Sequence, residues 1–405
     1  MQLAPPDAAP GVSRSRSGSA GGSADSSRRI PWFVWIVLAG MMSLWLMLGF
    51  VMAPGARSHD FLNLYTGAAL ALDGKGGELH DPQVQLDRER VAVPNLPALI
   101  PFVRPAFYAL ALAPLAWLPL PAAFVVWLVG QTLLLAACWV WGWWRFGSNA
   151  LVFAAFFLPL PLGIASGQDC TIMLALFIAA YELHERKLAF AAGMVLALML
   201  TKFHLILLWP VALVVQRRWR MLAGFLAAAS VELGASLAFG GVRGMQTYVE
   251  LLRNKSIERL SPSPELMVNY QGLADNLGLT AAWAMAAIVV TIFAIFVVSI
   301  RNAPGWRLFS LTALASILVA PHAYAYDAAV LLLPVLLIIF RSAHPLSRIA
   351  ATLFATPIPF ALALAGKPYA IASSLSTLLL FMILSSETIF PASQPTTPPP
   401  GAGAS

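Results

Sequence analysis

Apolar runs separated by short polar segments make up most of the chain. The first extends from Ile30 to Met52 almost without interruption, and about 20 apolar residues in a helix cross a hydrocarbon core about 30 Å thick. Further runs follow as far as residue 390, so the pattern predicts an all-α polytopic membrane protein. Residues 1–28 and 391–405 lack this pattern, and we expect them to be disordered tails around a membrane domain at 29–390.

Short basic clusters between the runs set the expected topology. Cytoplasmic loops of membrane proteins are enriched in Lys and Arg, and one arrangement of about 12 spans puts all clusters and both termini on the cytoplasmic side. The clusters are Arg28-Arg29, Arg145, Arg186-Lys187, Arg217-Arg218-Arg220, Arg301 with Arg307, and Arg341 with Arg348. The predicted spans are 31–52, 121–144, 149–166, 170–183, 188–201, 204–216, 221–240, 279–300, 307–320, 327–340, 347–366 and 369–388.

This topology leaves two long segments on the outer side, 53–120 and 241–278. Within the first, the apolar stretch from Phe102 to Trp117 has to remain outside as a re-entrant or interfacial helix, because a full span there would invert every later basic cluster. A cleaved signal peptide is an alternative for the first apolar run, with Ala53-Pro54-Gly55-Ala56 as the cleavage site. That run is longer than the usual apolar region of about 7 to 15 residues.

Composition agrees with the membrane class. The chain is 59% hydrophobic and 11% charged, with a mean hydropathy of +0.77, whereas soluble domains carry about 25% charged residues. The net charge of +7 does not indicate a nucleic-acid partner, because the basic residues lie where topology signals lie. The two cysteines, Cys138 and Cys170, support neither a disulfide framework nor a cysteine metal site.

A carboxylate follows the first apolar run closely, in the string Ser58-His59-Asp60-Phe61. The predicted topology delivers Asp60, with His59 beside it, to the outer membrane surface. This position suits a catalytic base at the bilayer interface. Asp60 also fits the N-cap of a helix that starts at Phe61, a common role for Asp.

Two predicted hairpins, 188–216 and 307–340, consist of helices too short to reach the outer surface, so their tips sink into the membrane. Irregular backbone at that depth lines a protein-filled or water-filled cavity. The tips carry Lys202, His204 and His322, residues suited to binding a lipid-linked phosphate. Gln168 and Asp169 form a third outer turn. Tyr324 and Asp327 either line the same cavity or cap the next span. Glu232 lies within a predicted span, where it is either functional or protonated and bonded to a neighbouring helix.

The order of these motifs resembles glycosyltransferase family 87 of the GT-C fold over residues 31–345. The motifs are Asp60-Phe61, Arg104-Pro105, Gly167-Gln168, Leu200-Thr201-Lys202 followed by Arg217-Arg218-Trp219-Arg220, and Pro321-His322 before Tyr326-Asp327. The family includes actinobacterial mannosyltransferases of phosphatidylinositol mannosides and an arabinofuranosyltransferase. Two motifs depart from its pattern: the usual Tyr-Pro-Pro is Val103-Arg104-Pro105 here, and the usual Lys-Pro is Lys202-Phe203.

The resemblance implies an inverting transferase that moves one mannose-like or arabinofuranose-like sugar from a polyprenyl monophosphate carrier to a glycolipid or glycan acceptor, without a metal or other cofactor. It implies Asp60 as general base, since a sugar hydroxyl is a poor nucleophile near neutral pH. Arg104 then joins Lys202, His204 and His322 as a ligand of the donor phosphate, whose charge must be stabilised as it leaves. The expected place is the cytoplasmic membrane of a bacterium, among membrane lipids, with the active site facing the periplasm or cell exterior.

Two other classes fit part of the pattern. A transporter or flippase of lipid-linked sugars uses short broken helices too, but the chain shows no convincing internal repeat and its polar residues crowd the outer side. An O-antigen-type polymerase or ligase is expected to have an arginine-rich loop late in the chain. The segment 241–278, with Arg243, Arg253, Lys255 and Arg259, keeps that alternative open.

Overall fold

The structure is a computed structural model that describes residues 60–253 and 263–390. The predicted first span at 31–52, His59 and both predicted tails lie outside the described residues. Within the described ranges every regular element is a helix.

The described helices range from 3 to 35 residues in length. In order they are α2 (Phe61–Leu72), η3 (Gly76–Glu78), α3 (Pro82–Ala92), α4 (Ala106–Leu112), η4 (Ala113–Trp117), α5 (Leu120–Phe146), α6 (Ser148–Phe156), α7 (Pro159–Ala165), α8 (Cys170–Glu185), α9 (Ala189–Ala197), η5 (Leu198–Ile206), α10 (Trp209–Val215), α11 (Trp219–Arg253), η6 (Pro264–Leu266), α13 (Tyr270–Asn276), α14 (Ala282–Ile300), α15 (Gly305–Val319), η7 (Ala325–Leu331), α16 (Leu332–Arg341), α17 (Pro345–Ala355), α18 (Ile358–Leu364) and α19 (Ile371–Ile389).

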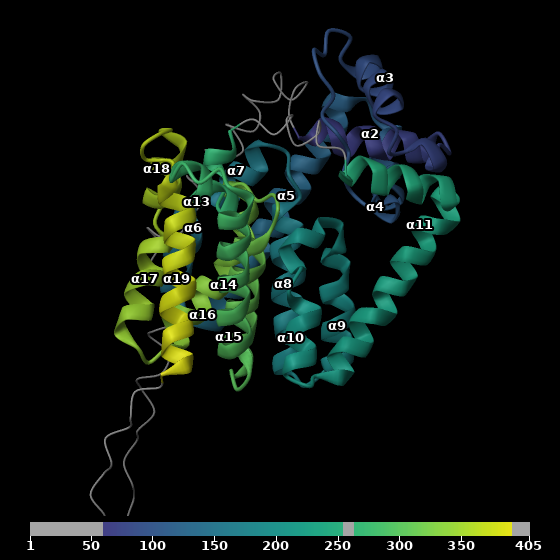
Figure 1. Cartoon of the computed structure of the whole chain (residues 1–405). Helices are drawn as coiled ribbons and strands as arrows, with labels where there is room; N and C mark the ends of the chain where they lie inside the picture. Colours follow the sequence, from purple (N-terminus) through teal and green to yellow (C-terminus); the bar gives the residue numbers. More distant parts are fainter. Residues whose placement is uncertain (1–59, 254–262, 391–405) are drawn as a thin grey trace, which may run out of the picture.

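Most of these helices run along one direction and form a bundle, while α2, α3 and α4 gather at one end of it (Figure 1). Among the described residues, five helices are long and apolar enough to cross a membrane: α5, α9 continued by η5, α11, α14 and α19. The total reaches seven when the bent pairs α6 with α7 (54°) and α17 with α18 (45°) each count as one span. This is the architecture of a polytopic membrane protein.

The predicted spans within the described ranges coincide with helices, although the total of about 12 stays a prediction. The span predicted at 121–144 is α5, that at 279–300 is α14, and that at 369–388 is α19. The span predicted at 170–183 corresponds to α8, which is 16 residues long, and the span at 307–320 to α15, which is 15 residues long. Such helices are short for a crossing of about 20 residues.

The outer segment predicted at 241–278 begins as a helix. The chain breaks at Gly241 (φ 62°) and then continues helically to Arg253. This extension packs on η3, and Tyr248 places its ring 4.4 Å from that of His80. Hydropathy missed it because charged and apolar residues alternate there, and only tertiary contact with the first outer segment gives the apolar ones a partner.

Close contact between α9 and α11 depends on two glycines. A Cβ atom at Gly193 would collide with the carbonyl of Met221, and one at Gly224 with the carbonyl of Phe190. Small residues let membrane helices approach closely enough for backbone to pack on backbone. This contact fixes the N-terminal part of α11 against α9, the helix that leads into η5.

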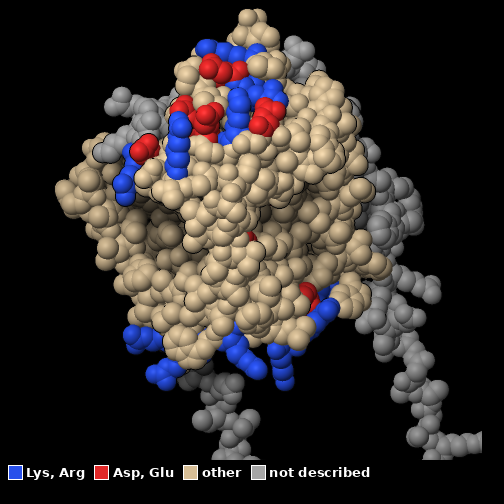
Figure 2. Space-filling model, turned by 90° about the vertical axis from the view of Figure 1, so that its right-hand side faces the viewer, with Lys and Arg blue, Asp and Glu red and all other residues tan. Residues whose placement is uncertain are grey.

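The two ends of the bundle differ in charge. Lys and Arg crowd one end, both signs mix at the other, and a broad uncharged belt lies between them (Figure 2). At the basic end, ion pairs and hydrogen bonds tie neighbouring turns together: Arg145 with Glu182 and Glu185, Arg341 with Glu185, Arg218 with His184, and Arg307 with Glu387. The basic clusters that these turns carry therefore share one end, as the topology prediction requires.

Candidate active site

Asp60 immediately precedes α2 at the end of the bundle opposite the basic clusters. Its side chain makes no capping hydrogen bond to α2, so the interpretation of Asp60 as a helix cap is wrong. The side chain of Gln168 instead lies beside the carboxylate and favours its ionised form. Burial raises the pKa of Asp60 above its usual range, while the Gln168 hydrogen bond and the positive charges of Lys202 and Arg104 oppose this rise.

The turn between α7 and α8 is built to receive the start of α2. Gly167 has φ of 74°, and a Cβ atom there would lie 2.6 Å from Cβ and 3.2 Å from the backbone nitrogen of Phe61. The indole Nε1 of Trp127 in α5 donates to the Gly167 carbonyl at 3.0 Å. Gly167 thus lies directly against Phe61. This contact places Gln168, which follows Gly167, near Asp60, which precedes Phe61.

This contact gives a first prediction. We expect Gly167→Ala to lower stability by about 1–3 kcal/mol, because the added methyl group overlaps Phe61 and the left-handed backbone disfavours a side chain. Gly130→Ala in α5 is the matched control, since nothing lies within 4 Å of its new methyl group. The measurement is thermal unfolding of both variants in detergent. Equal unfolding temperatures for Gly167→Ala and wild type would contradict the proposed contact.

Four charged side chains from four segments form a buried network beside Asp60. Nη2 of Arg104 lies 3.2 Å from Oδ1 of Asp169. Nζ of Lys202 lies 3.1 Å from the same Asp169 oxygen and 2.8 Å from Oδ1 of Asp327. The two positive and two negative charges compensate each other, and both carboxylates are almost fully buried.

Lys202 sits where the helical backbone is interrupted. Its φ of −119° and ψ of 64° break η5, which agrees with a turn predicted between 201 and 204. An ammonium group has three N–H donors, and here they face Asp327, Asp169 and the Sγ of Cys170 at 3.6 Å. With a side chain 1% exposed, Lys202 serves first as the centre of the network.

The two predicted histidines lie on the rim of this network. Nε2 of His204 is 3.9 Å from Oδ1 of Asp327, too long for a hydrogen bond, and has no hydrogen-bond partner in the described structure. The ring of His322 packs against that of Tyr324 at 4.9 Å. Burial lowers the pKa of His322 to about 4, so it is neutral near pH 7 and acts as a hydrogen-bonding group there.

Asp327 has a second role at the start of η7. Its Oδ2 accepts a hydrogen bond from the backbone nitrogen of Tyr324 at 3.0 Å, as part of a capping box. Asp327 therefore caps η7 through Oδ2 and pairs with Lys202 through Oδ1, while its role as a site residue stays a prediction.

Sequence reasoning missed three residues that neighbour the network. Tyr326 places its ring 5.4 Å from Nζ of Lys202, and Tyr108 of α4 lies within electrostatic reach of Asp169 and Arg104. Cys170 is the third. Tyr326 and Cys170 are neighbours in sequence of the predicted residues Asp327 and Asp169, and this adjacency could have identified them. The sequence around Tyr108 gave no such signal.

Glu232 in α11 stays apart from the network. It is 8% exposed, and neither carboxylate oxygen has a hydrogen-bond partner among the described residues. One turn further, Oγ of Ser236 accepts a hydrogen bond from the backbone of Phe107 at the start of α4. The predicted hydrogen bond of Glu232 to a neighbouring helix is not seen in this part of the chain.

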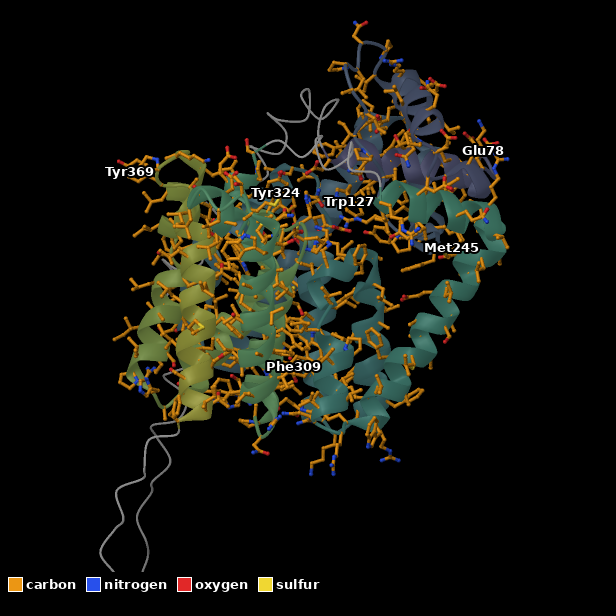
Figure 3. The ribbon with its side chains drawn as sticks, in the orientation of Figure 1. Glu78, Trp127, Met245, Phe309, Tyr324 and Tyr369 are labelled. Atoms are coloured by element: carbon orange, nitrogen blue, oxygen red, sulfur yellow. The ribbon has the colours of Figure 1, made fainter. Side chains whose placement is uncertain are left out.

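The site lies near the end of the bundle crossed by α2. Trp127 and Tyr324 lie at about the same level there, below the layer formed by α2 and α3 (Figure 3). The belt of the face shown in Figure 2 is hollowed, and an acidic side chain is visible inside. The site therefore combines the carboxylate of Asp60, whose pKa is raised, with a charge-compensated network of buried side chains.

Residues 102–321, more than half of the chain, match the family described as Glycosyltransferase family 87. The matched range contains Arg104, Gln168, Asp169 and Lys202, while Asp60 and Asp327 lie outside it. No curated protein and no solved structure matches the chain.

Proposed function

Because the chain belongs to glycosyltransferase family 87, we propose that it transfers one sugar from a polyprenyl monophosphate carrier to the hydroxyl group of a glycolipid or glycan, with Asp60 as general base. The observation that carries the proposal is the meeting of Asp60 with the Arg104–Asp169–Lys202–Asp327 network at one end of the bundle. A mannose-like or arabinofuranose-like sugar is the proposed donor.

Asp60 has the properties that the displacement requires. The base must accept the proton of the acceptor hydroxyl as its oxygen bonds to the anomeric carbon and the bond to the carrier phosphate breaks. Burial raises the pKa of Asp60, which brings its proton affinity closer to the working pH. One base suffices for a single displacement with inversion, because the departing phosphate monoester needs charge stabilisation rather than a proton.

The donor phosphate is proposed to bind at Arg104, Lys202, His204 and His322. Nη2 of Arg104 is engaged by Gln168 and Asp169, so its other guanidinium N–H groups are the proposed phosphate ligands. His204, whose Nε2 lacks a hydrogen-bond partner among the described residues, and His322 add neutral donors. Lys202 contributes its charge from behind these groups, since its own N–H groups face the carboxylates and Cys170.

The proposed orientation puts this site on the outer side of the cytoplasmic membrane of a bacterium. Its support is the separation of the basic clusters from α2 by the length of the bundle, because positively charged loops favour the cytoplasmic side. The uncharged belt between the two ends suits burial in lipid, where the apolar tail of a polyprenyl carrier resides.

The test is transfer by the purified full chain in detergent or vesicles. It is incubated with a panel of polyprenyl-phosphate monosaccharides and a membrane glycolipid extract, and release of polyprenyl phosphate is followed. We expect at least one donor to turn over only when acceptor is present. Nucleotide sugars are the comparison donors, and turnover of these in place of lipid-linked sugars would contradict the proposed donor class. Movement of an intact carrier across the vesicle without sugar transfer would favour a flippase.

A second prediction concerns metals. We expect EDTA to leave the transfer rate within about twofold, because the donor phosphate is proposed to be held by N–H groups of Arg104, His204 and His322 rather than by a bound cation. The measurement compares rates with EDTA, without it, and after adding back Mg²⁺ or Mn²⁺. Loss with EDTA and recovery with one of these ions would overturn the metal-free mechanism.

A further inference from the structure

Gln168 joins Asp60 to the charge network. It is 6% exposed, and its Oε1 accepts a hydrogen bond from Nη2 of Arg104 at 3.2 Å. The contact of Gly167 with Phe61 brings the same side chain beside Asp60, whose ionised form it favours. Its backbone is fixed as well, since its N–H donates to the carbonyl of Gly163 at 2.9 Å and the preceding Gly167 carbonyl is held by Trp127.

The chemistry of the neighbours decides which way the amide faces. A guanidinium group has donors only, so the amide oxygen must face Arg104. The amide NH₂ is then left for Asp60, which as a carboxylate only accepts hydrogen bonds. Arg104 thereby orients Gln168, and Gln168 in turn donates to the carboxylate.

We propose that Gln168 is a positioning residue, which keeps Asp60 ionised and holds one of its oxygens so that the other is presented to the acceptor hydroxyl. This inference rests on the proposed function in one respect only, the role of Asp60 as base. The influence of Gln168 on the protonation of Asp60 belongs to the chain itself and is measurable without any sugar transfer.

Burial and several charged groups act on Asp60 besides Gln168. Arg104, just before α4, and Lys202, in η5, favour the carboxylate, whereas Asp327, in η7, disfavours it. Lys202 and Asp327, whose charged atoms are 2.8 Å apart, act on Asp60 in opposite directions. The hydroxyl of Tyr326 is also within electrostatic reach. Of the influences that lower the pKa of Asp60, the hydrogen bond from Gln168 is the largest.

The experiment titrates Asp60 directly in the purified full chain. Infrared difference spectra follow the carbonyl band of the protonated carboxyl, which is assigned by its loss in Asp60→Asn. We expect Gln168→Met to raise the midpoint by about one pH unit, because a donor to the charged form is lost. Gln168→Glu should raise it further, since a second carboxylate then faces the first. Gln131→Met, at another buried glutamine, is the control and should leave the midpoint in place.

The pH profile of transfer gives the matching functional readout. The base acts when ionised, so the rate rises with pH, and a higher pKa moves the rising limb to higher pH. The Gln168 variants should therefore be slow at low pH and recover as the pH is raised. A residue needed only for folding would lower the rate equally at every pH. An unchanged midpoint in Gln168→Met and Gln168→Glu overturns the inference even if the enzyme transfers sugar; a raised midpoint supports it even if the proposed donor proves wrong.

Discussion

Asp60→Asn lowers the rate of sugar transfer by about 10³-fold while donor binding stays within about twofold of wild type. Removal of a general base typically costs 10²- to 10⁴-fold, roughly the range of this expectation. Asparagine has nearly the same shape as aspartate, and its side-chain oxygen still accepts the hydrogen bond from Gln168. It has no basic oxygen for the acceptor proton, so the loss falls on the chemical step.

Asp73→Asn, at the C-terminal end of α2, is the matched control for Asp60→Asn. Asp73 follows Leu72, has a side chain 43% exposed and lies 3.5 Å from Arg88. Asp73→Asn should transfer sugar at the wild-type rate, because a surface ion pair contributes little and lies away from the site. The measurements are initial rates at saturating donor, with binding of a non-transferable donor analogue. Transfer by Asp60→Asn within tenfold of wild type would reject Asp60 as the base.

The positions of the helices were predictable from the sequence because a lipid environment leaves few choices. Backbone polar groups in hydrocarbon must be paired within the segment, so each apolar run has to be helical. The turn at Lys202 and the turn at His322 were predictable for a related reason, since the runs beside them are too short for the bilayer. Basic residues identified the opposite end. Family membership was predictable from the order of the motifs.

The ion pairs that the site residues form could not be predicted from the sequence. Asp327 is 125 residues from Lys202, and Asp169 is 65 residues from Arg104. Spacing along the chain does not report which carboxylate meets which cation, because packing of separate helices decides it. The sequence therefore suggested cations open to a phosphate, whereas the structure places Lys202 inside a compensated network. The neutral state of His322 depends in the same way on burial that only the folded chain supplies.

Lys202→Met is expected to destabilise the folded protein in the absence of any substrate, by about 3–5 kcal/mol. The substitution keeps the length of the side chain but leaves Asp169 and Asp327, which are 0% and 2% exposed, without their shared cation. An uncompensated charge in such a place costs much more than a broken surface pair. The unfolding temperature in detergent should fall on the order of 10 °C.

Lys367→Met tests whether the effect belongs to the network. Lys367 also pairs with a carboxylate, Asp275 at 2.9 Å, but its side chain is 56% exposed, so this variant should unfold close to wild type. The double variant Lys202→Met with Asp327→Asn removes one negative charge together with the positive one. It should recover part of the lost stability, because the two residues interact directly.

Stability and donor binding separate the two roles assigned to Lys202. If the ammonium served the donor phosphate alone, Lys202→Met would bind donor weakly yet unfold like wild type. If it is the centre of the network, stability falls without donor, and the double variant regains stability without regaining transfer. The second outcome is expected, because all three N–H groups of Lys202 already face protein acceptors. Arg104, with guanidinium N–H groups beyond those bound to Gln168 and Asp169, is then the proposed cationic ligand of the donor phosphate.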